Sequence, residues 1–435
     1  MKALLGDSFK FSLLRNSIIQ LLWWIIFFPG FFSSDSFGAV SQAKSGDLSL
    51  DGSVSWAIYI RYFSFLGNAI PLLTIISGLA LTYSITCLAY SLSSKKIAAI
   101  SSFVLVTTPL VSAMGITLWH DIPFTAGLIL VSAFFAAQFN RGSELTNRFW
   151  LMLFPGSVLL TFRPNGLPTL IFFAILYFLL NRNRKILIDL VCAITVASVI
   201  SIGFSYLFFK QPPINSLFAQ EFMREDISCY ASLEKGNGFV ERNLPGISNT
   251  EGWSSPDACT FLSRSKLTVD DKMKAVNLVP QVWLRLILND PMFVLNTHMK
   301  RHAYLLPIPL YGIPLTPFIH SNIQFIDSGI EWAFPQVAEK ARILPRAWNA
   351  SRGFFGWAGL WLVVMVYLSR RYKKPELAPL ILMSFAQMSL LFIVAPIPDG
   401  RYALFVLITG QICLLAKIIE SISTLKTRQK ITKEQ

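Results

Sequence analysis

Charged residues are scarce in this sequence. Asp, Glu, Lys and Arg together make up 14% of the 435 residues, whereas 53% are hydrophobic, and the mean hydropathy of +0.53 is too high for an ordinary soluble domain. Several motifs are also missing. The chain has no P-loop or other nucleotide-binding glycine motif, which argues against an ATP-driven pump. Its five cysteines show no zinc-type spacing, and no internal repeat is visible.

Long apolar runs are what the sequence has in their place. Each run is roughly 15–24 residues long, which is about the length that a tilted helix needs to cross hydrocarbon. We therefore predict an all-α polytopic membrane protein with about ten transmembrane helices. The runs are 18–32, 69–92, 97–118, 122–139, 149–162, 166–180, 186–209, 354–369, 377–394 and 402–419.

The net charge of +14 follows the predicted topology. If the N-terminus is cytoplasmic and the crossings alternate, the inside segments hold 19 of the 38 Lys and Arg residues but 6 of the 24 Asp and Glu residues. This asymmetry places both termini in the cytoplasm, makes membrane lipids the partner of the basic segments, and leaves little for a nucleic-acid partner to explain. We expect a bacterial inner-membrane protein. Lys2, Lys10 and Arg15 could also be the basic start of a cleaved signal peptide. Cleavage would leave nine crossings and so put the basic C-terminus on the wrong side, and we therefore favour an uncleaved first helix.

Three regions follow from the runs: a transmembrane module over 1–209, an extracytoplasmic portion over 210–352, and the last three crossings with a cytoplasmic tail over 353–435. In the first external loop, 33–68, apolar residues at helical spacing predict a short interfacial helix around Trp56.

In the second region, four prolines within 303–319 exclude a regular crossing helix. The basic patch "NTHMKRH", from Asn296 to His302, could bind pyrophosphate, an acidic glycan or lipid headgroups, but a solvated face explains it more simply. Cys229 and Cys259 could form a disulfide in an oxidising compartment. The remaining cysteines, Cys87, Cys192 and Cys413, fall in apolar runs and predict packing residues.

Polar residues gather at the predicted external ends of the crossings, in "SSDSF", "LWHDIPF", "TFRPNGLP" and "IPDGRYAL". They supply Asp35, His120, Asp121, Arg163, Asn165, Asp399 and Arg401. The presence of Asn165 and Asp399 is explained equally well by turn formation and by function, because Asn and Asp before Gly favour turns. The two arginines are different. Their loops are short and run against the positive-inside bias, so each guanidinium needs a phosphate or carboxylate partner.

The order and side of these short motifs resemble the GT-C superfamily of integral-membrane glycosyltransferases over nearly the whole chain. The relevant features are an acid after the first helix (Asp35), an acid with a proline at the fourth (Asp121), an Arg-Pro-Asn-Gly turn after the fifth (Arg163) and an Arg-Tyr pair near the last (Arg401). The chain is similar to the group of dolichyl-phosphate-mannose protein mannosyltransferases and aminoarabinose transferases. It departs from them in lacking a His-Pro-Pro or Tyr-Pro pair in the first external loop, where Asp47 or Asp51 could act instead.

The resemblance implies transfer of a sugar from a polyprenyl-phosphate donor to a glycan, lipid or protein acceptor on the extracytoplasmic face. Inverting displacement needs a base, for which we predict Asp35. It also needs cations at the leaving phosphate, for which we predict Arg163 and Arg401, supported by Tyr402 and Asn165. Asp121 could orient the acceptor, brace an arginine or share a divalent metal, Mg or Mn, with Asp35 and His120.

Three other functions stay open on the sequence, of which a non-catalytic scaffold is one. Ten crossings with polar helix ends would also suit a secondary transporter, although transporters place their charges near mid-membrane. A lipid-linked oligosaccharide ligase or polymerase would use external arginines and a large external loop as well.

Overall fold

The computed structural model is helical throughout the part of the chain that it describes. Those residues are 8–45, 53–140, 145, 149–203, 206–207, 220–233, 236, 238–244, 259, 275, 277–302, 305, 332–351, 355–394 and 400–434. Within these ranges no β-strand occurs, and an isolated bridge joins Phe31 to Thr117. The predicted all-α fold class is confirmed. Asp47, Asp51, Asp399 and the proline-rich segment 303–319, apart from Leu305, lie outside the described residues.

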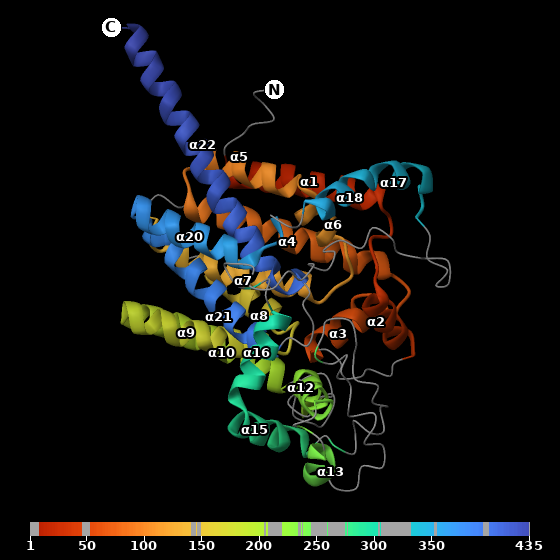
Figure 1. Ribbon diagram of the computed structural model, residues 1–435. Coiled ribbons are helices and arrows are strands. Elements are labelled where there is room, and N and C mark those ends of the chain that lie inside the picture. Colours follow the sequence, from red (N-terminus) through yellow and green to blue (C-terminus); the bar gives the residue numbers. More distant parts are fainter. Residues whose placement is uncertain are drawn as a thin grey trace.

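Each predicted apolar run coincides with a helix or a pair of helices (Figure 1). The helices of the bundle are α1 (Phe9–Ile26), α4 (Ile70–Leu92), α5 (Lys95–Val106), α6 (Pro109–Gly115), α7 (Asp121–Ala137), α8 (Leu153–Leu160), α9 (Gly166–Asn181), α10 (Arg184–Ser198), α20 (Ala358–Tyr372), α21 (Ala378–Val394) and α22 (Leu404–Glu434). Four helical stretches in the described chain are long and apolar enough to cross a membrane, or five if α5 and α6 form one span bent by 64°. The chain is a multi-pass integral membrane protein.

The bend between α5 and α6 corrects one predicted crossing. The sequence predicts a single run over 97–118, but the helix stops at Val106 and restarts at Pro109. Proline has no amide hydrogen to donate and its ring clashes with the preceding turn, so it can begin α6 but cannot continue α5. The chain direction therefore changes inside the apolar run, and the segment before α7 comes back toward the end of α1.

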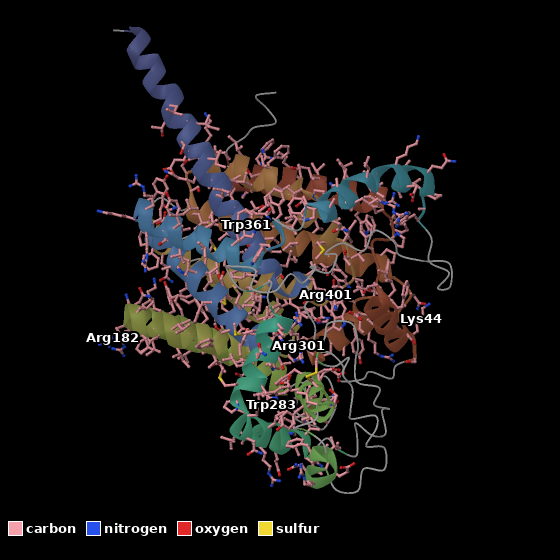
Figure 2. All side chains as sticks on the ribbon, viewed as in Figure 1. Lys44, Arg182, Trp283, Arg301, Trp361 and Arg401 are labelled. Carbon is pink, nitrogen blue, oxygen red and sulfur yellow. A yellow bond between two sulfur atoms is a disulfide. The ribbon has the colours of Figure 1, made fainter. Side chains whose placement is uncertain are left out.

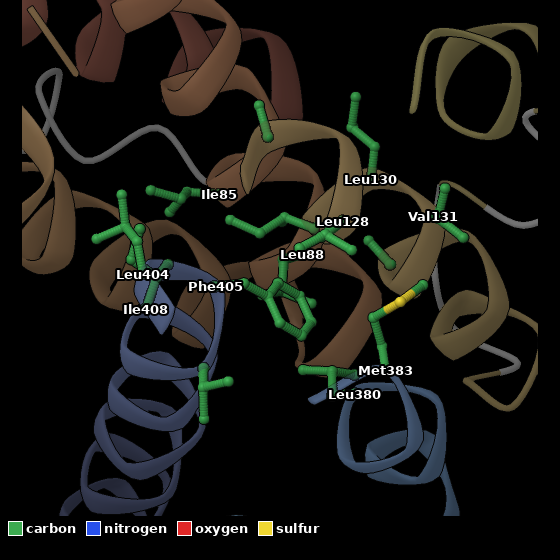
Figure 3. Close-up of a cluster of buried hydrophobic side chains, with 14 of the residues drawn as sticks. Ile85, Leu88, Leu128, Leu130, Val131, Leu380, Met383, Leu404, Phe405 and Ile408 are labelled. Carbon is green, nitrogen blue, oxygen red and sulfur yellow. The ribbon is translucent and has the colours of Figure 1, made fainter. Parts of the chain in front are cut away.

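The core of the bundle is built around α7, every residue of which is buried. Helices α4, α8, α21 and α22 surround it, and Figure 3 shows side chains of α4, α7, α21 and α22 meeting in one cluster. Helices α7 and α8 cross at two glycines: a Cβ at Gly127 would lie 2.8 Å from the carbonyl oxygen of Gly156. Small residues at such a crossing let the two backbones approach.

A second helical portion has its own small core. It consists of α12 (Glu221–Ala231), α13 (Phe239–Asn243), α15 (Val279–Asn289) and α16 (Pro291–Arg301), which enclose a cluster that includes Ile227 and Val282. A disulfide joins Cys229 of α12 to Cys259. The portion contacts the bundle at α21. The short helices α17 (Pro335–Ala341) and α18 (Ile343–Ala350) lead back to the bundle, where they contact α1 and α6.

The two ends of the bundle carry different elements. Helices α2 (Ser34–Ser45) and α3 (Val54–Tyr62) lie together at one end, and α3 is the helix that the sequence predicts around Trp56. Lys44 of α2 and Arg182, just after α9, mark opposite ends in Figure 2, and Arg401 lies toward the end that carries Lys44. The following site is built at this end.

Candidate active site

Two segments that follow apolar helices are tied together at the site end of the bundle. After α1, Phe31 donates its backbone N–H to the carbonyl oxygen of Ile116 and accepts from the N–H of Leu118, both at 3.0 Å. Gly30 makes this approach possible, because its φ is +121° and a Cβ there would lie 2.6 Å from the carbonyl oxygen of Ile116. The start of α2 is thereby held beside the start of α7.

Side chains reinforce this junction. The Ser36 hydroxyl donates to the carbonyl oxygen of Leu118 at 2.8 Å, and the Trp119 indole N–H donates to the Ser33 hydroxyl at 2.7 Å. Asp35 lies between the two serines on the first turn of α2, and Asp121 is the first residue of α7. The junction therefore brings two carboxylates that are 86 residues apart in sequence to one place.

Arg401 joins the two carboxylates. It lies on the short turn η10 (Gly400–Ala403) just before α22. Its Nη2 atom is 2.8 Å from Oδ2 of Asp35, and its Nε atom is 3.8 Å from Oδ2 of Asp121. The Asp35 side chain is 39% exposed, whereas those of Arg401 and Asp121 are 7% and 1% exposed. The exposed carboxylate is therefore at the mouth of the site and the buried one is at its base.

Arg163 completes an alternating row of charges. It follows α8, is buried, and donates from Nη1 to Oδ1 of Asp121. The Tyr402 ring lies against both guanidiniums, with its centroid 4.4 Å from Cζ of Arg163 and 5.3 Å from Cζ of Arg401. The Trp119 ring is 4.8 Å from Cζ of Arg401. Ion pairs and aromatic faces together fix both cations in position.

His120 lies beside this row. Its Nε2 atom is 3.9 Å from Oδ2 of Asp121, and its ring is 5.8 Å from that of Trp56. Burial, reinforced by the charges of Arg163 and Arg401 and opposed by those of Asp121 and Asp35, lowers the pKa of His120 to about 4. The imidazole is therefore neutral at neutral pH and can both donate and accept a hydrogen bond.

Several buried polar atoms of the site have no hydrogen-bond partner among the described residues. They are Nε2 of His120, Oδ2 of Asp121, Nε of Arg163 and both polar atoms of the Asn165 amide. The side chain of Asn165 precedes α9 without capping it. Because buried polar atoms are normally satisfied, this concentration of free donors and acceptors indicates a place for a polar ligand.

The structure thus brings Asp35, His120, Asp121, Arg163, Arg401 and Tyr402 together, with Asn165 two residues from Arg163. We call Asp35, His120, Asp121, Arg163 and Arg401 the site cluster. The sequence offered no sign of Ser33 and Ser36, which hold its frame. Trp119, only 2% exposed, lies beneath Arg401 and braces it.

A divalent metal does not fit the site cluster. Asp35 and Asp121 each pair with a guanidinium, whose positive charge repels a second cation, and no group of three His, Cys, Asp or Glu side chains in the described chain could hold a metal. We derive no step through a metal from Asp35, Asp121 and His120.

The prediction of a solvated face from Asn296 to His302 holds for Asn296 and Lys300, which are exposed, but was wrong for the other basic residues of the patch. His298, Arg301 and His302 are all buried. Asp226 of α12 binds His298 Nε2 at 2.7 Å and accepts hydrogen bonds from Arg301 Nη1 and the Trp283 indole N–H, both at 2.9 Å. We call Asp226, Trp283, His298 and Arg301 the docking cluster, because His298 Nδ1 lies 2.6 Å from the Phe392 carbonyl oxygen of α21.

No family model and no curated protein matches the chain. Among solved structures, it is similar to ArnT from Cupriavidus metallidurans bound to undecaprenyl phosphate. The match covers 93% of this chain and 77% of that chain at 14% identity, with a TM-score of 0.38. A likeness at this level carries no argument about activity, so we infer the function from the site cluster.

Proposed function

We propose that this protein is a membrane glycosyltransferase that moves a sugar from a polyprenyl-phosphate donor to an acceptor glycan, lipid or protein. One observation carries the proposal: an accessible carboxylate, Asp35, lies beside two buried guanidiniums, Arg163 and Arg401, at one end of a membrane bundle. A base near water and fixed cations at the leaving group are the two requirements of direct displacement from a phosphate.

Arg163 and Arg401 are the groups that we assign to the donor phosphate. Charge grows on that phosphate as the bond to the sugar breaks, and fixed guanidiniums in a poorly hydrated place stabilise it without having to reorient. The unpartnered Nε of Arg163 supports this assignment, because one N–H is directed at no acceptor in the described chain. Neutral His120 and the Asn165 amide can bind sugar hydroxyls.

The exposed fractions separate the roles of the two carboxylates. We assign Asp35, at the mouth, to the acceptor: its carboxylate takes the hydroxyl proton while the acceptor oxygen bonds to the anomeric carbon and the carbon–phosphate oxygen bond breaks. The electron pair of the broken bond leaves with the polyprenyl phosphate, and the configuration at the anomeric carbon is inverted. Asp121 at the base holds both arginines and so is a positioning residue.

In this mechanism Asp35 and the donor phosphate compete for Arg401. The ion pair at 2.8 Å holds Oδ2 of Asp35 against Nη2 of Arg401, so neither atom is available to a substrate while the pair persists. A phosphate that takes over Nη2 of Arg401 would release Asp35 to act as base. Donor binding therefore precedes proton removal from the acceptor.

The test uses the purified chain in nanodiscs with polyprenyl-phosphate sugars and polyprenyl-diphosphate glycans that carry a radiolabel. Label transfer from the monophosphate donor to a membrane acceptor supports the proposal. Transfer from the diphosphate donor alone indicates a ligase, and the absence of transfer together with uptake of label into sealed vesicles indicates a transporter; either result overturns it.

We further propose that the site faces away from the cytoplasm and that both termini face it. Arg182 lies at the end of the bundle opposite to Lys44 of α2 (Figure 2), and the C-terminal end of α22 points away from α2 and α3 (Figure 1), as expected if the basic segments remain inside. An impermeant thiol reagent applied to right-side-out vesicles should label a cysteine placed at Lys44 and leave one at Arg182 unlabelled. The opposite pattern would contradict this orientation.

A further inference from the structure

A cavity of about 530 Å³ opens at the end of the bundle opposite to the site cluster. It lies between the C-terminal ends of α4, α7 and α20 and the middle of α22, and it has the size of a small-molecule site. The charged residues of its lining are Lys374, Glu376, Lys417 and Glu420, and Tyr372 lies beside them. No step of the proposed reaction uses this cavity.

The four charges form an alternating set. Glu420 lies 3.1 Å from the Lys417 ammonium and 3.9 Å from that of Lys374, which is in turn 3.6 Å from Glu376. The Lys417 ammonium also lies 3.8 Å from the centroid of the Tyr372 ring. Glu376 is 13% exposed and Lys374 33% exposed. The Lys374 ammonium thus lies farther from both carboxylates than a good hydrogen bond allows, although only a third of its side chain is exposed.

We propose that this cavity binds the headgroup of a zwitterionic aminophospholipid of the phosphatidylethanolamine type. Its phosphate would bind Lys374 and Lys417, and its primary ammonium would bind Glu376. A ligand with both charges complements a lining that has two cations and two anions, whereas an anionic headgroup would add a negative charge beside Glu376 and Glu420 and bring no ammonium to balance it.

The remainder of the lining selects a lipid rather than a soluble zwitterion. Leu92, Ile97, Leu368 and Leu377 contribute apolar surface to the same cavity. Leu92 and Leu368 belong to the last turns of α4 and α20, two apolar helices of the bundle. The ends of such helices lie at headgroup level, so the charged part of the cavity meets the headgroup and the apolar part meets the glycerol and the first chain carbons.

The experiment measures which lipids stay bound to the full-length chain. Wild-type protein is extracted from nanodiscs of equal phosphatidylethanolamine, phosphatidylcholine and phosphatidylglycerol, and retained lipid is identified by native mass spectrometry. We expect about a tenfold preference for phosphatidylethanolamine over each of the others, as one charge-assisted hydrogen bond provides. Glu376→Gln should reduce the preference over phosphatidylcholine to about twofold, and Lys374→Gln should reduce retention of all three lipids.

Arg371→Gln is the matched control, because Arg371 is exposed on the same basic stretch and does not line the cavity. It should retain lipids as the wild type does. Equal or greater retention of phosphatidylglycerol, or a loss of preference in Arg371→Gln as large as in Glu376→Gln, would overturn the proposal and indicate general attraction to a basic surface. Thermal melting of each variant ensures that only folded protein is compared.

Discussion

The site cluster and the docking cluster are built from similar residues yet differ in how completely they are satisfied. In the docking cluster, Asp226 receives three partners within 2.9 Å and is fully buried. In the site cluster, Asp35 is 39% exposed, and Oδ2 of Asp121 faces His120 and Arg401 at 3.9 and 3.8 Å. Incomplete satisfaction marks the cluster at which we propose that the substrate binds, and complete satisfaction marks the one that holds two parts of the fold together.

The electrostatics of the docking cluster agree with its complete satisfaction. Burial would raise the pKa of Asp226, but Arg301 and the hydrogen bonds from His298 and Trp283 outweigh it and lower the pKa. The Asp226 carboxylate therefore stays ionised, because neighbouring positive charge and hydrogen-bond donors compensate its negative charge. His298 also meets a carbonyl oxygen in the last turn of α21, where backbone acceptors lack helical partners.

The largest effect that we expect is on the rate of transfer. Asp35→Asn removes the base and should lower the rate of sugar transfer by about 10²–10⁴-fold. Because the side chain is 39% exposed, the melting temperature should stay close to that of the wild type. The same variant should bind a polyprenyl phosphate several-fold more tightly, since Arg401 no longer pairs with the Asp35 carboxylate. Unchanged or weaker carrier binding would contradict the competition for Arg401, and full activity would contradict the assignment of the base.

Asp226→Asn should have the opposite profile. Removing one partner of a buried ion pair leaves uncompensated charge, so we expect the free energy of unfolding to fall by about 3–5 kcal/mol. Glu339→Gln is the control. The Glu339 side chain is 54% exposed, so loss of its ion pairs should cost at most about 1 kcal/mol. Thermal and denaturant melts of the purified variants measure both. If Asp226→Asn melted like the wild type, the docking cluster would not hold α16 to α21.

The sequence predicts much of the site cluster for a physical reason. Charged residues in short turns between apolar runs are few, and Arg163 and Arg401 oppose the charge bias of the side on which the sequence predicts them. Helices alternate in direction, so residues that follow odd-numbered runs must share an end. Convergence of Asp35, Asp121, Arg163 and Arg401 follows from topology as well as from local pattern.

What the sequence could not supply depends on contacts between distant segments. The partner of His298 is Asp226, 72 residues earlier. Both residues are buried, but nothing in the sequence around either of them indicates that burial. The same holds for the bond from Trp119 to Ser33, which fixes the distance between two loops. The break at Pro109 was visible in the sequence but stood inside a run whose hydropathy alone indicated one helix.

Arg401→Lys should have an intermediate effect. Lysine has a single ammonium and cannot pair with Asp35 through Nη2, face Asp121 through Nε and lie flat on Trp119 at once. We expect binding of a polyprenyl phosphate to weaken by about tenfold, as loss of one charge-assisted contact gives. Arg346→Lys, at a 51% exposed arginine remote from the site, is the control for isothermal titration. Equal binding by Arg401→Lys and wild type would remove Arg401 from the phosphate site.

The smallest effect that we expect is a difference in how acid destabilises the two clusters. The pKa of His120 is lowered to about 4 in the folded protein, so the unfolded chain takes up this proton first as the pH falls, and stability drops between about pH 6.5 and 4. The pKa of Asp226 is lowered from 3.8, so its contribution is kept above that pH and is lost only below it. Melting temperatures measured from pH 7 to 4 should therefore fall less steeply in His120→Asn than in the wild type, whereas Asp226→Asn should lower the whole curve without changing its slope in that interval. Parallel curves for wild type and His120→Asn would show that His120 is not held neutral by burial, and the contrast between an incompletely satisfied site cluster and a saturated docking cluster would then rest on geometry alone.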